Sequence, residues 1–269
     1  MAIPIYTGEN LVNDMIVLLV CYLYIFMTII IPITLKKKDK ISSFTARKAV
    51  HLLAGLVVIL VPFFTRPLGT FWAVLIAFSM TIIVYKSEKG SKVKLLEDFY
   101  QAIGEEAEEK LKRAYLQGPF HYAVSITLLV SIFAIIQLIG FIIPIIPWQN
   151  QMYVAISGLL ILFISDTLAS LVGKKYGKIK INLSWTGTVR SLEGSLVFFI
   201  SAFLLAFFSL FIFGYLASTL TLPAVIIYSI IIAAIGTIVE ILSPSTWDDL
   251  TVPIITTIIF FIFTNFIIF

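Results

Sequence analysis

Long apolar runs without charge constrain this chain more than any other feature. Residues 194 to 239 form a stretch of 46 positions without one charged side chain. That stretch is too long for one buried helix, and it has the length of two helices that each cross about 30 Å of hydrocarbon. Gly214 and Pro223 bracket the expected turn between them. Water therefore cannot be the main solvent of this chain.

Six further apolar runs predict six more spans, and they lie at residues 15–35, 49–64, 68–85, 122–147, 152–172 and 250–269. The composition agrees, because 60% of the residues are hydrophobic and only 13% are charged, whereas globular domains are about a quarter charged. We predict an all-α, polytopic membrane protein with about eight transmembrane helices. Residues 1–269 are expected to form a single integral membrane domain.

The basic residues predict the orientation of these spans. Eighteen of the nineteen lysines and arginines lie in segments 36–48, 86–113 and 174–190, and only Arg66 lies elsewhere. Eight spans place all three segments on one side, which the positive-inside rule makes cytoplasmic. Both termini then lie outside. The expected location is the plasma membrane of a prokaryote or the endoplasmic reticulum of a eukaryote.

The sequence gives no support for a nucleic-acid-binding protein, a cysteine-based site or a removable signal peptide. The basic residues lie in short loops and form no nucleic-acid-binding motif, so we expect no nucleic-acid partner. Cys21 is the only cysteine, which excludes a disulfide or a thiolate metal site within one chain. The first residues lack a basic n-region and a small-residue cleavage site, and we expect no removable signal peptide. The oligomeric state is left open.

Residues 86–118 form a charged insertion between the third and fourth spans. From residue 88 to residue 115, apolar side chains recur every three or four positions, which predicts a cytoplasmic amphipathic helix; they are Leu96, Phe99, Ile103, Ala107 and Leu111. A helix lying on the lipid headgroups explains this pattern, and a regulatory role or a gate for substrate is the alternative.

Asp166 is the charged residue that lies deepest in an apolar run. It precedes Gly173 by seven positions, which places it roughly 10 Å inside the end of the fifth span. A charge retained inside a membrane segment is a functional hypothesis by default. The alternative is that Asp166 only holds helices together by pairing with a lysine or a backbone group.

A loop rich in glycine and lysine follows Asp166. It can bind phosphate, because glycine allows close backbone approach and lysine supplies positive charge; the residues concerned are Gly173, Lys174, Lys175, Gly177, Lys178 and Arg190. The loop lacks the spacing of a Walker A motif. Taken alone, it also fits a simple positive-inside loop.

Four more carboxylates lie on the same side. Glu193 begins a span, where it either complements the helix dipole or takes part in binding. Glu240, Asp248 and Asp249 lie in the loop before the last span, and no lysine or arginine is near them in the sequence. Such carboxylates suit Mg²⁺ held jointly with substrate phosphates. The alternative is that they only solvate a short turn.

Arg47, Lys48 and His51 open the second span, and Arg47 and His51 share one helix face. A plain basic helix end explains the first two but not a histidine inside an apolar run. Carboxylates, lysines, arginines and a histidine on one side of the membrane favour phosphoryl or nucleotidyl transfer to a membrane-embedded acceptor.

Three stretches resemble the CTP-dependent polyprenol kinase family, which includes dolichol kinase and phytol kinase and is distantly related to the CDP-diacylglycerol synthases. The first is the Asp-Thr-x-Ala run from Asp166 with its glycine-lysine loop. The second is Ser-x-Glu-Gly-Ser at residues 191–195, and the third is Glu240 followed by Asp-Asp-Leu-Thr-Val-Pro at 248–253. Arg47, Lys48 and His51 also match, so the resemblance runs from about residue 45 to the end. Arg190 stands where the family often has lysine, and Asp249 where it often has asparagine.

The resemblance implies a kinase of lipid metabolism that transfers the γ-phosphate of CTP to the hydroxyl of a prenol, with dolichol favoured over phytol or geranylgeraniol. It implies Mg²⁺ as cofactor, with CTP, a prenol and membrane lipids as partners. The expected catalytic residues are Asp166, Glu240 and Asp248. The expected metal ligands are Asp166, Glu193, Glu240, Asp248 and Asp249. The expected nucleotide-binding residues are Gly173, Lys174, Lys175, Gly177, Lys178, Arg190, Glu193, Arg47, Lys48 and His51.

Two other functions remain open. A lipid cytidylyltransferase attacks the α-phosphate of CTP and releases pyrophosphate, and it uses similar groups. A transporter also places an aspartate inside the membrane, although here the charges gather on one face instead of following a path through the bilayer.

Overall fold

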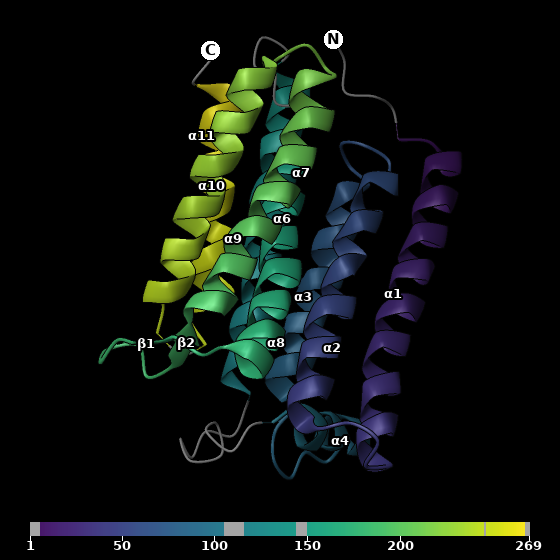
Figure 1. The fold of residues 1–269 in the computed structure, drawn as a ribbon. Helices are drawn as coiled ribbons and strands as arrows, with labels where there is room; N and C mark the ends of the chain where they lie inside the picture. The colour runs from purple at the N-terminus through teal and green to yellow at the C-terminus, as the bar shows by residue number, and fades with distance from the viewer. Residues whose placement is uncertain (1–5, 105–115, 144–149, 245, 267–269) are drawn as a thin grey trace. The chain divides into compact units, whose positions relative to one another are not determined.

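The computed structural model describes residues 6–104, 116–143, 150–244 and 246–266 (Figure 1). In this part of the chain nearly all regular structure is helical. The one sheet there pairs β1 (Lys180–Asn182) with β2 (Val189–Ser191) as an antiparallel hairpin. The chain divides into two compact units, 1–152 and 153–269, and each is described by itself. The single domain expected from the sequence stays a prediction.

The N-terminal unit consists of helices that pack against one another, with α1 against α2, α3 and α4, and α3 against α6. Ser42 caps the start of α2, because its hydroxyl accepts the Thr45 N–H at 3.2 Å. A 3₁₀ segment, Leu56–Phe63, continues α2. The bounds of these helices are α1 Gly8–Lys37, α2 Ser43–Gly55, α3 Thr70–Lys86, α4 Lys94–Ile103 and α6 Gln117–Ile142.

A buried aspartate lies in the second turn of α1. The sequence predicts a span from residue 15, but α1 begins at Gly8 and so contains Asp14, which is fully buried. The Asp14 carboxylate accepts the Thr65 N–H at 2.8 Å and a hydrogen bond from the Tyr6 hydroxyl. Gly69 lies so close that a Cβ there would collide with Asp14 Oδ2. Asp14 therefore ties α1 to the turn before α3.

Helix α4 is shorter than the amphipathic helix predicted from residue 88. It begins at Lys94, because Gly90 adopts a turn with φ of 78°. Its apolar side chains Phe99 and Ile103 are buried in a cluster with residues of α1 and α2. Protein therefore covers Phe99 and Ile103 of the predicted apolar face, and the position of this helix on lipid headgroups stays a prediction. Residues 105–115 of the prediction lie outside the described residues.

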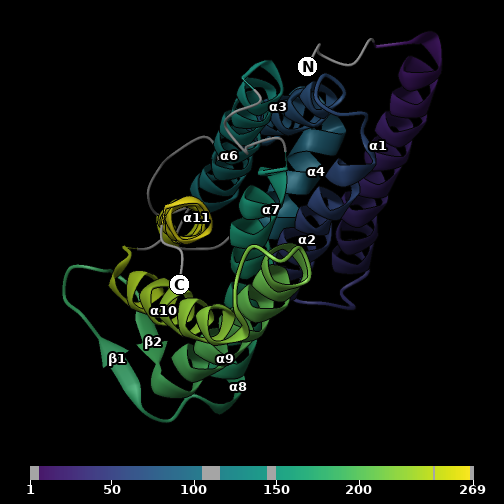
Figure 2. The same ribbon diagram turned by 90° about the horizontal axis from the view of Figure 1, so that it is seen from above.

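The C-terminal unit begins within α7 (Met152–Leu160), which continues through a π-helical turn, Ile161–Asp166, into α8 (Thr167–Tyr176). The hairpin follows, and then α9 (Leu192–Leu210), α10 (Leu222–Leu242) and α11 (Asp248–Asn265). Helix α9 packs against α8 and α10, and α10 packs against α11 (Figures 1 and 2). Helix α9 continues into a π-helical turn, Phe211–Tyr215, and residues 216–221 separate this turn from α10, as Gly214 and Pro223 predict.

The helices have the lengths that a membrane requires. Seven spans among the described residues are long and apolar enough to cross a bilayer. Helix α3 is apolar too, but its 17 residues extend only about 25 Å. The predicted all-α architecture with about eight transmembrane helices is confirmed. The chain is an integral membrane protein.

Candidate active site

Asp166 ends the π-helical turn between α7 and α8. It is buried, and so are its neighbours Ser165 and Thr167. A π-helical turn inserts an extra residue into a helix and is frequent at functional sites, because it changes the direction of the side chains that follow. The local backbone thus supports the prediction that Asp166 has a function beyond helix packing.

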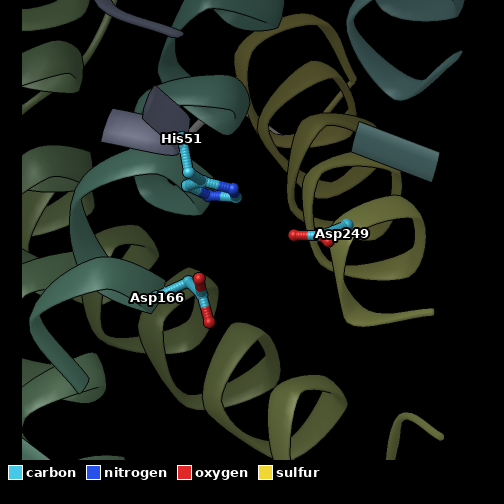
Figure 3. Close-up of side chains that lie close together, drawn as sticks. All are labelled: His51, Asp166 and Asp249. Carbon is cyan, nitrogen blue, oxygen red and sulfur yellow. The ribbon is translucent and has the colours of Figure 1, made fainter. Parts of the chain in front are cut away.

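Asp249 supplies a second carboxylate beside Asp166. It lies in the first turn of α11 and is also buried. The two side chains lie across from each other (Figure 3), and an oxygen of Asp166 and an oxygen of Asp249 are within 4.8 Å of one another. The structure thus brings together two residues that are 83 positions apart in the sequence.

Arg190 connects the other two acids. Its guanidinium donates from Nη1 to Glu240 at the end of α10 and from Nη2 to Asp248 at 3.0 Å, at the start of α11. The side chains of Arg190, Glu240 and Asp248 are only 14%, 6% and 19% exposed. No lysine or arginine lies near these acids in the sequence, but β2 brings to them an arginine that precedes Glu240 by 50 positions.

The charges of this cluster act on one another. Burial alone would lower the pKa of Arg190, but the nearby carboxylates of Asp248 and Glu240 outweigh it and raise the pKa above its ordinary value. Asp166 adds to this effect through its charge. Arg190 is therefore positively charged at any physiological pH, and Asp166 lies within the range of its field.

Several buried polar atoms of this unit make no hydrogen bond within the described residues. They include Oε2 of Glu240, Nε of Arg190, and the hydroxyls of Ser165, Thr167 and Ser195. Buried polar groups are normally hydrogen-bonded, so these atoms are available to a bound ligand, ion or water. The three hydroxyls are not among the predicted site residues, although two of them belong to the motifs that contain Asp166 and Glu193.

The glycines of the loop make close helix packing possible. A Cβ at Gly194 would lie 2.9 Å from the Ala169 carbonyl oxygen and 3.3 Å from Cα of Gly173, and one at Gly177 would lie 2.6 Å from Ser191 Oγ. Helices α8 and α9 therefore meet at a crossing that admits no side chain. The predicted phosphate contacts of Gly173 and Gly177 stay predictions, and the structure gives both residues a packing role.

Glu193 holds the segment between α8 and β1. Its carboxylate accepts the Lys178 N–H at 2.9 Å and the Ile179 N–H at 3.3 Å. Ser191 caps the same helix start, since its hydroxyl accepts the Gly194 N–H at 3.2 Å. Glu193 therefore fixes the backbone beside the lysines, a role that differs from the metal ligation predicted for it.

The predicted lysines lie at the end of α8. Lys174, Lys175 and Lys178 are exposed, and Nζ of Lys175 lies 5.0 Å from the centre of the Tyr176 ring. Exposed lysine side chains next to a fixed backbone are accessible to an anion in solution. Their predicted contacts with phosphate remain predictions.

Arg47, Lys48 and His51 lie on α2, in the N-terminal unit. Arg47 and Lys48 are half-buried and His51 is buried. The His51 ring lies 4.4 Å from the Tyr122 ring, centre to centre, and the Tyr122 hydroxyl donates to the His51 carbonyl at 2.7 Å. This packing explains how a histidine fits within an apolar span. Its predicted participation in nucleotide binding stays a prediction.

The donor groups of the C-terminal unit fit a hard divalent cation. Asp166 and Asp249 offer carboxylate oxygens close together, and Glu240 keeps one buried oxygen that makes no hydrogen bond to any described residue. Mg²⁺ is bound through one or two carboxylates, with water and substrate phosphate completing its shell. The carboxylate ligands present therefore fit Mg²⁺, the expected cofactor, both in their chemical type and in their number.

Comparison with known proteins gives one informative relative. The chain is 32% identical over 174 residues to dolichol kinase of Saccharomyces cerevisiae, and the match covers 65% of this chain and 29% of the yeast protein. The chain thus matches less than a third of the length of this relative. No protein-family model and no solved structure matches the chain. The match to the yeast protein confirms the resemblance to the polyprenol kinases that the motifs predict.

Proposed function

We propose that this chain, which resembles the polyprenol kinase family, transfers the γ-phosphate of CTP to the hydroxyl of a prenol lipid. The observation that carries the proposal is the similarity to yeast dolichol kinase. The buried carboxylates beside a lysine-rich segment support it, because phosphoryl transfer requires groups that position the reactants and balance charge on phosphate. Dolichol is the favoured acceptor.

The membrane location suits such an acceptor. A prenol has one hydroxyl and a long apolar tail, so it stays in the bilayer while its hydroxyl reaches toward the aqueous face. Asp166 lies inside its span, seven residues before the glycine that precedes the lysines. A carboxylate at that depth is suited to meet a hydroxyl from the lipid side and a nucleotide from the water side. We propose that this side is cytoplasmic.

In the proposed reaction the prenol oxygen forms a bond with the γ-phosphorus of CTP. The bond between that phosphorus and the β–γ bridging oxygen breaks, and CDP leaves. Asp166 accepts the proton that the alcohol loses. Glu240 and Asp248 are the other two catalytic carboxylates of the proposal. Arg190 holds both of them in position through its hydrogen bonds.

Mg²⁺ bound to these carboxylates would balance the negative charge on the phosphate oxygens. We propose that Asp166 and Asp249 hold it, that Glu240 and Asp248 contribute, and that Glu193 fixes the backbone beside the lysines. Lys174, Lys175 and Lys178 bind the phosphates of the nucleotide, with Gly173 and Gly177 allowing close approach. Arg190 adds positive charge, and Arg47, Lys48 and His51 complete the nucleotide-binding set.

The test uses purified full-length protein with Mg²⁺ and each of the four ribonucleoside triphosphates, against a panel of dolichol, phytol, geranylgeraniol and farnesol. Mass spectrometry identifies the lipid product. We expect a prenyl monophosphate and CDP from CTP. A CDP-linked lipid would show a cytidylyltransferase instead. Ion or solute flux in proteoliposomes without nucleotide turnover would show a transporter.

A further inference from the structure

An apolar groove of about 420 Å³ runs between α1, α3 and α4 of the N-terminal unit. Its two polar side chains, Tyr22 and Ser79, hydrogen-bond to each other at 2.9 Å and so offer no free polar group. The rest of its wall is aliphatic, aromatic or thioether, and includes Leu23, Phe26, Ile30, Met80, Ile83 and Leu96. The groove therefore suits a flexible apolar chain.

A basic segment borders one end of this groove. The last wall residue on α3 is Ile83 and the first on α4 is Leu95, so the connection between the two helices lies at that end. Residues 86–94 of this connection carry four lysines, Lys86, Lys89, Lys92 and Lys94, and one acid, Glu88. All four lysine side chains are exposed.

An apolar groove that ends at exposed lysines matches the two parts of an anionic lipid. Lysines beside a membrane attract anionic headgroups, and a groove between membrane helices is filled by a hydrocarbon chain. A neutral prenol would gain nothing from the lysines. We propose that the groove holds one acyl chain of an anionic phospholipid, whose phosphate lies against Lys86, Lys89, Lys92 and Lys94.

Native mass spectrometry of the purified full-length protein tests this site. The protein is titrated with phosphatidylglycerol and, separately, with phosphatidylcholine that carries the same acyl chains. We expect phosphatidylglycerol to bind at least about tenfold more tightly, because the lysines act on its net charge. Equal binding of the two lipids would overturn the proposal.

Two pairs of variants locate the site. Met80→Trp fills the groove and should weaken phosphatidylglycerol binding, whereas Phe78→Trp changes an exposed residue of α3 outside the wall and should not. Replacing the four lysines by glutamine should abolish the preference for the anionic lipid, and replacing them by arginine should preserve it. If Met80→Trp does not fold, the lysine variants still decide the matter, because they leave the groove intact.

Two outcomes would refute the site. Undiminished phosphatidylglycerol binding by both Met80→Trp and the glutamine variant would place the lipid elsewhere. Displacement of phosphatidylglycerol by a neutral prenol at lower concentration than by a second anionic lipid would assign the groove to the tail of a prenol instead.

Discussion

Arg190 donates a hydrogen bond to Glu240 although 50 positions separate them in the chain, and its second nitrogen reaches Asp248. One arginine thus joins the hairpin to the ends of α10 and α11. The arrangement keeps two carboxylates side by side at low exposure, which would otherwise repel each other. It makes Arg190 a positioning residue of the acidic cluster as well as a proposed phosphate contact.

Replacing Arg190 should therefore destabilise the protein. Arg190→Gln leaves Glu240 buried without its cation, which costs about 3 kcal/mol in the free energy of unfolding. Thermal unfolding in detergent, followed by tryptophan fluorescence, measures the effect.

The double variant Arg190→Gln with Glu240→Gln is the matched control. It removes both charges, and we expect it to recover most of the lost stability. If the single variant is as stable as the original protein, the ion pair does not hold these elements together.

Asp166→Asn and Asp249→Asn should each reduce turnover by at least about 100-fold, because both remove a carboxylate from the proposed reaction and metal site while keeping the shape of the side chain. Yield and thermal stability should change little. The measurement is the initial rate of prenyl phosphate formation over a range of Mg²⁺ concentrations.

Asp39→Asn is the control for these variants. Asp39 is exposed, and asparagine tolerates its φ of 51°, so this variant should keep full activity. Near-normal activity of Asp166→Asn would remove Asp166 from the centre of the mechanism.

Gly194→Ala should separate α8 from α9. Its Cβ would lie too close to the Ala169 carbonyl and to Gly173, and forcing an extra methyl group into such a contact costs about 1–3 kcal/mol. Gly8→Ala serves as the comparison, because no atom of the described residues lies within 4 Å of a Cβ at that position. We expect a lower unfolding temperature for Gly194→Ala alone. Equal unfolding temperatures would show that the crossing can widen freely.

Glu193→Gln should weaken nucleotide binding more than catalysis. The carboxylate fixes the backbone of Lys178 and Ile179, and an amide oxygen accepts these hydrogen bonds less strongly. We expect KM for CTP to rise several-fold with kcat nearly unchanged. A fall in kcat at constant KM would instead support direct metal ligation by Glu193.

The sequence predicts the spans well, because uncharged runs of this length have few other structures available in lipid. Gly214 and Pro223 also predict the turn before α10 correctly. The sequence predicts that the first span begins at residue 15, because the charged Asp14 ends the apolar run, whereas α1 includes Asp14. Its hydrogen-bond partner Tyr6 precedes α1, and its partner Thr65 follows α2. A local sequence pattern does not predict contacts between segments so far apart.

The sequence singles out the carboxylates and the arginine of the candidate site but neither their pairings nor the buried hydroxyls of Ser165, Thr167 and Ser195. Depth in a span singles out Asp166, and motif resemblance adds Asp249, yet nothing local predicts that their oxygens approach within 4.8 Å. The pairing of Arg190 with Glu240 and Asp248 depends on the hairpin β1–β2, which is too short to leave a periodic signal. Gly187, with φ of 66°, marks its turn and is the one local sign of it.

The central claim is γ-phosphoryl transfer from CTP to a prenol, and the fate of two labels tests it directly. Purified protein is incubated with a prenol, Mg²⁺ and CTP labelled either in the α- or in the γ-phosphate, and the lipid is extracted and counted. Our account predicts that γ label enters the lipid and that α label stays in CDP. Entry of α label into the lipid, or of neither label, would contradict it.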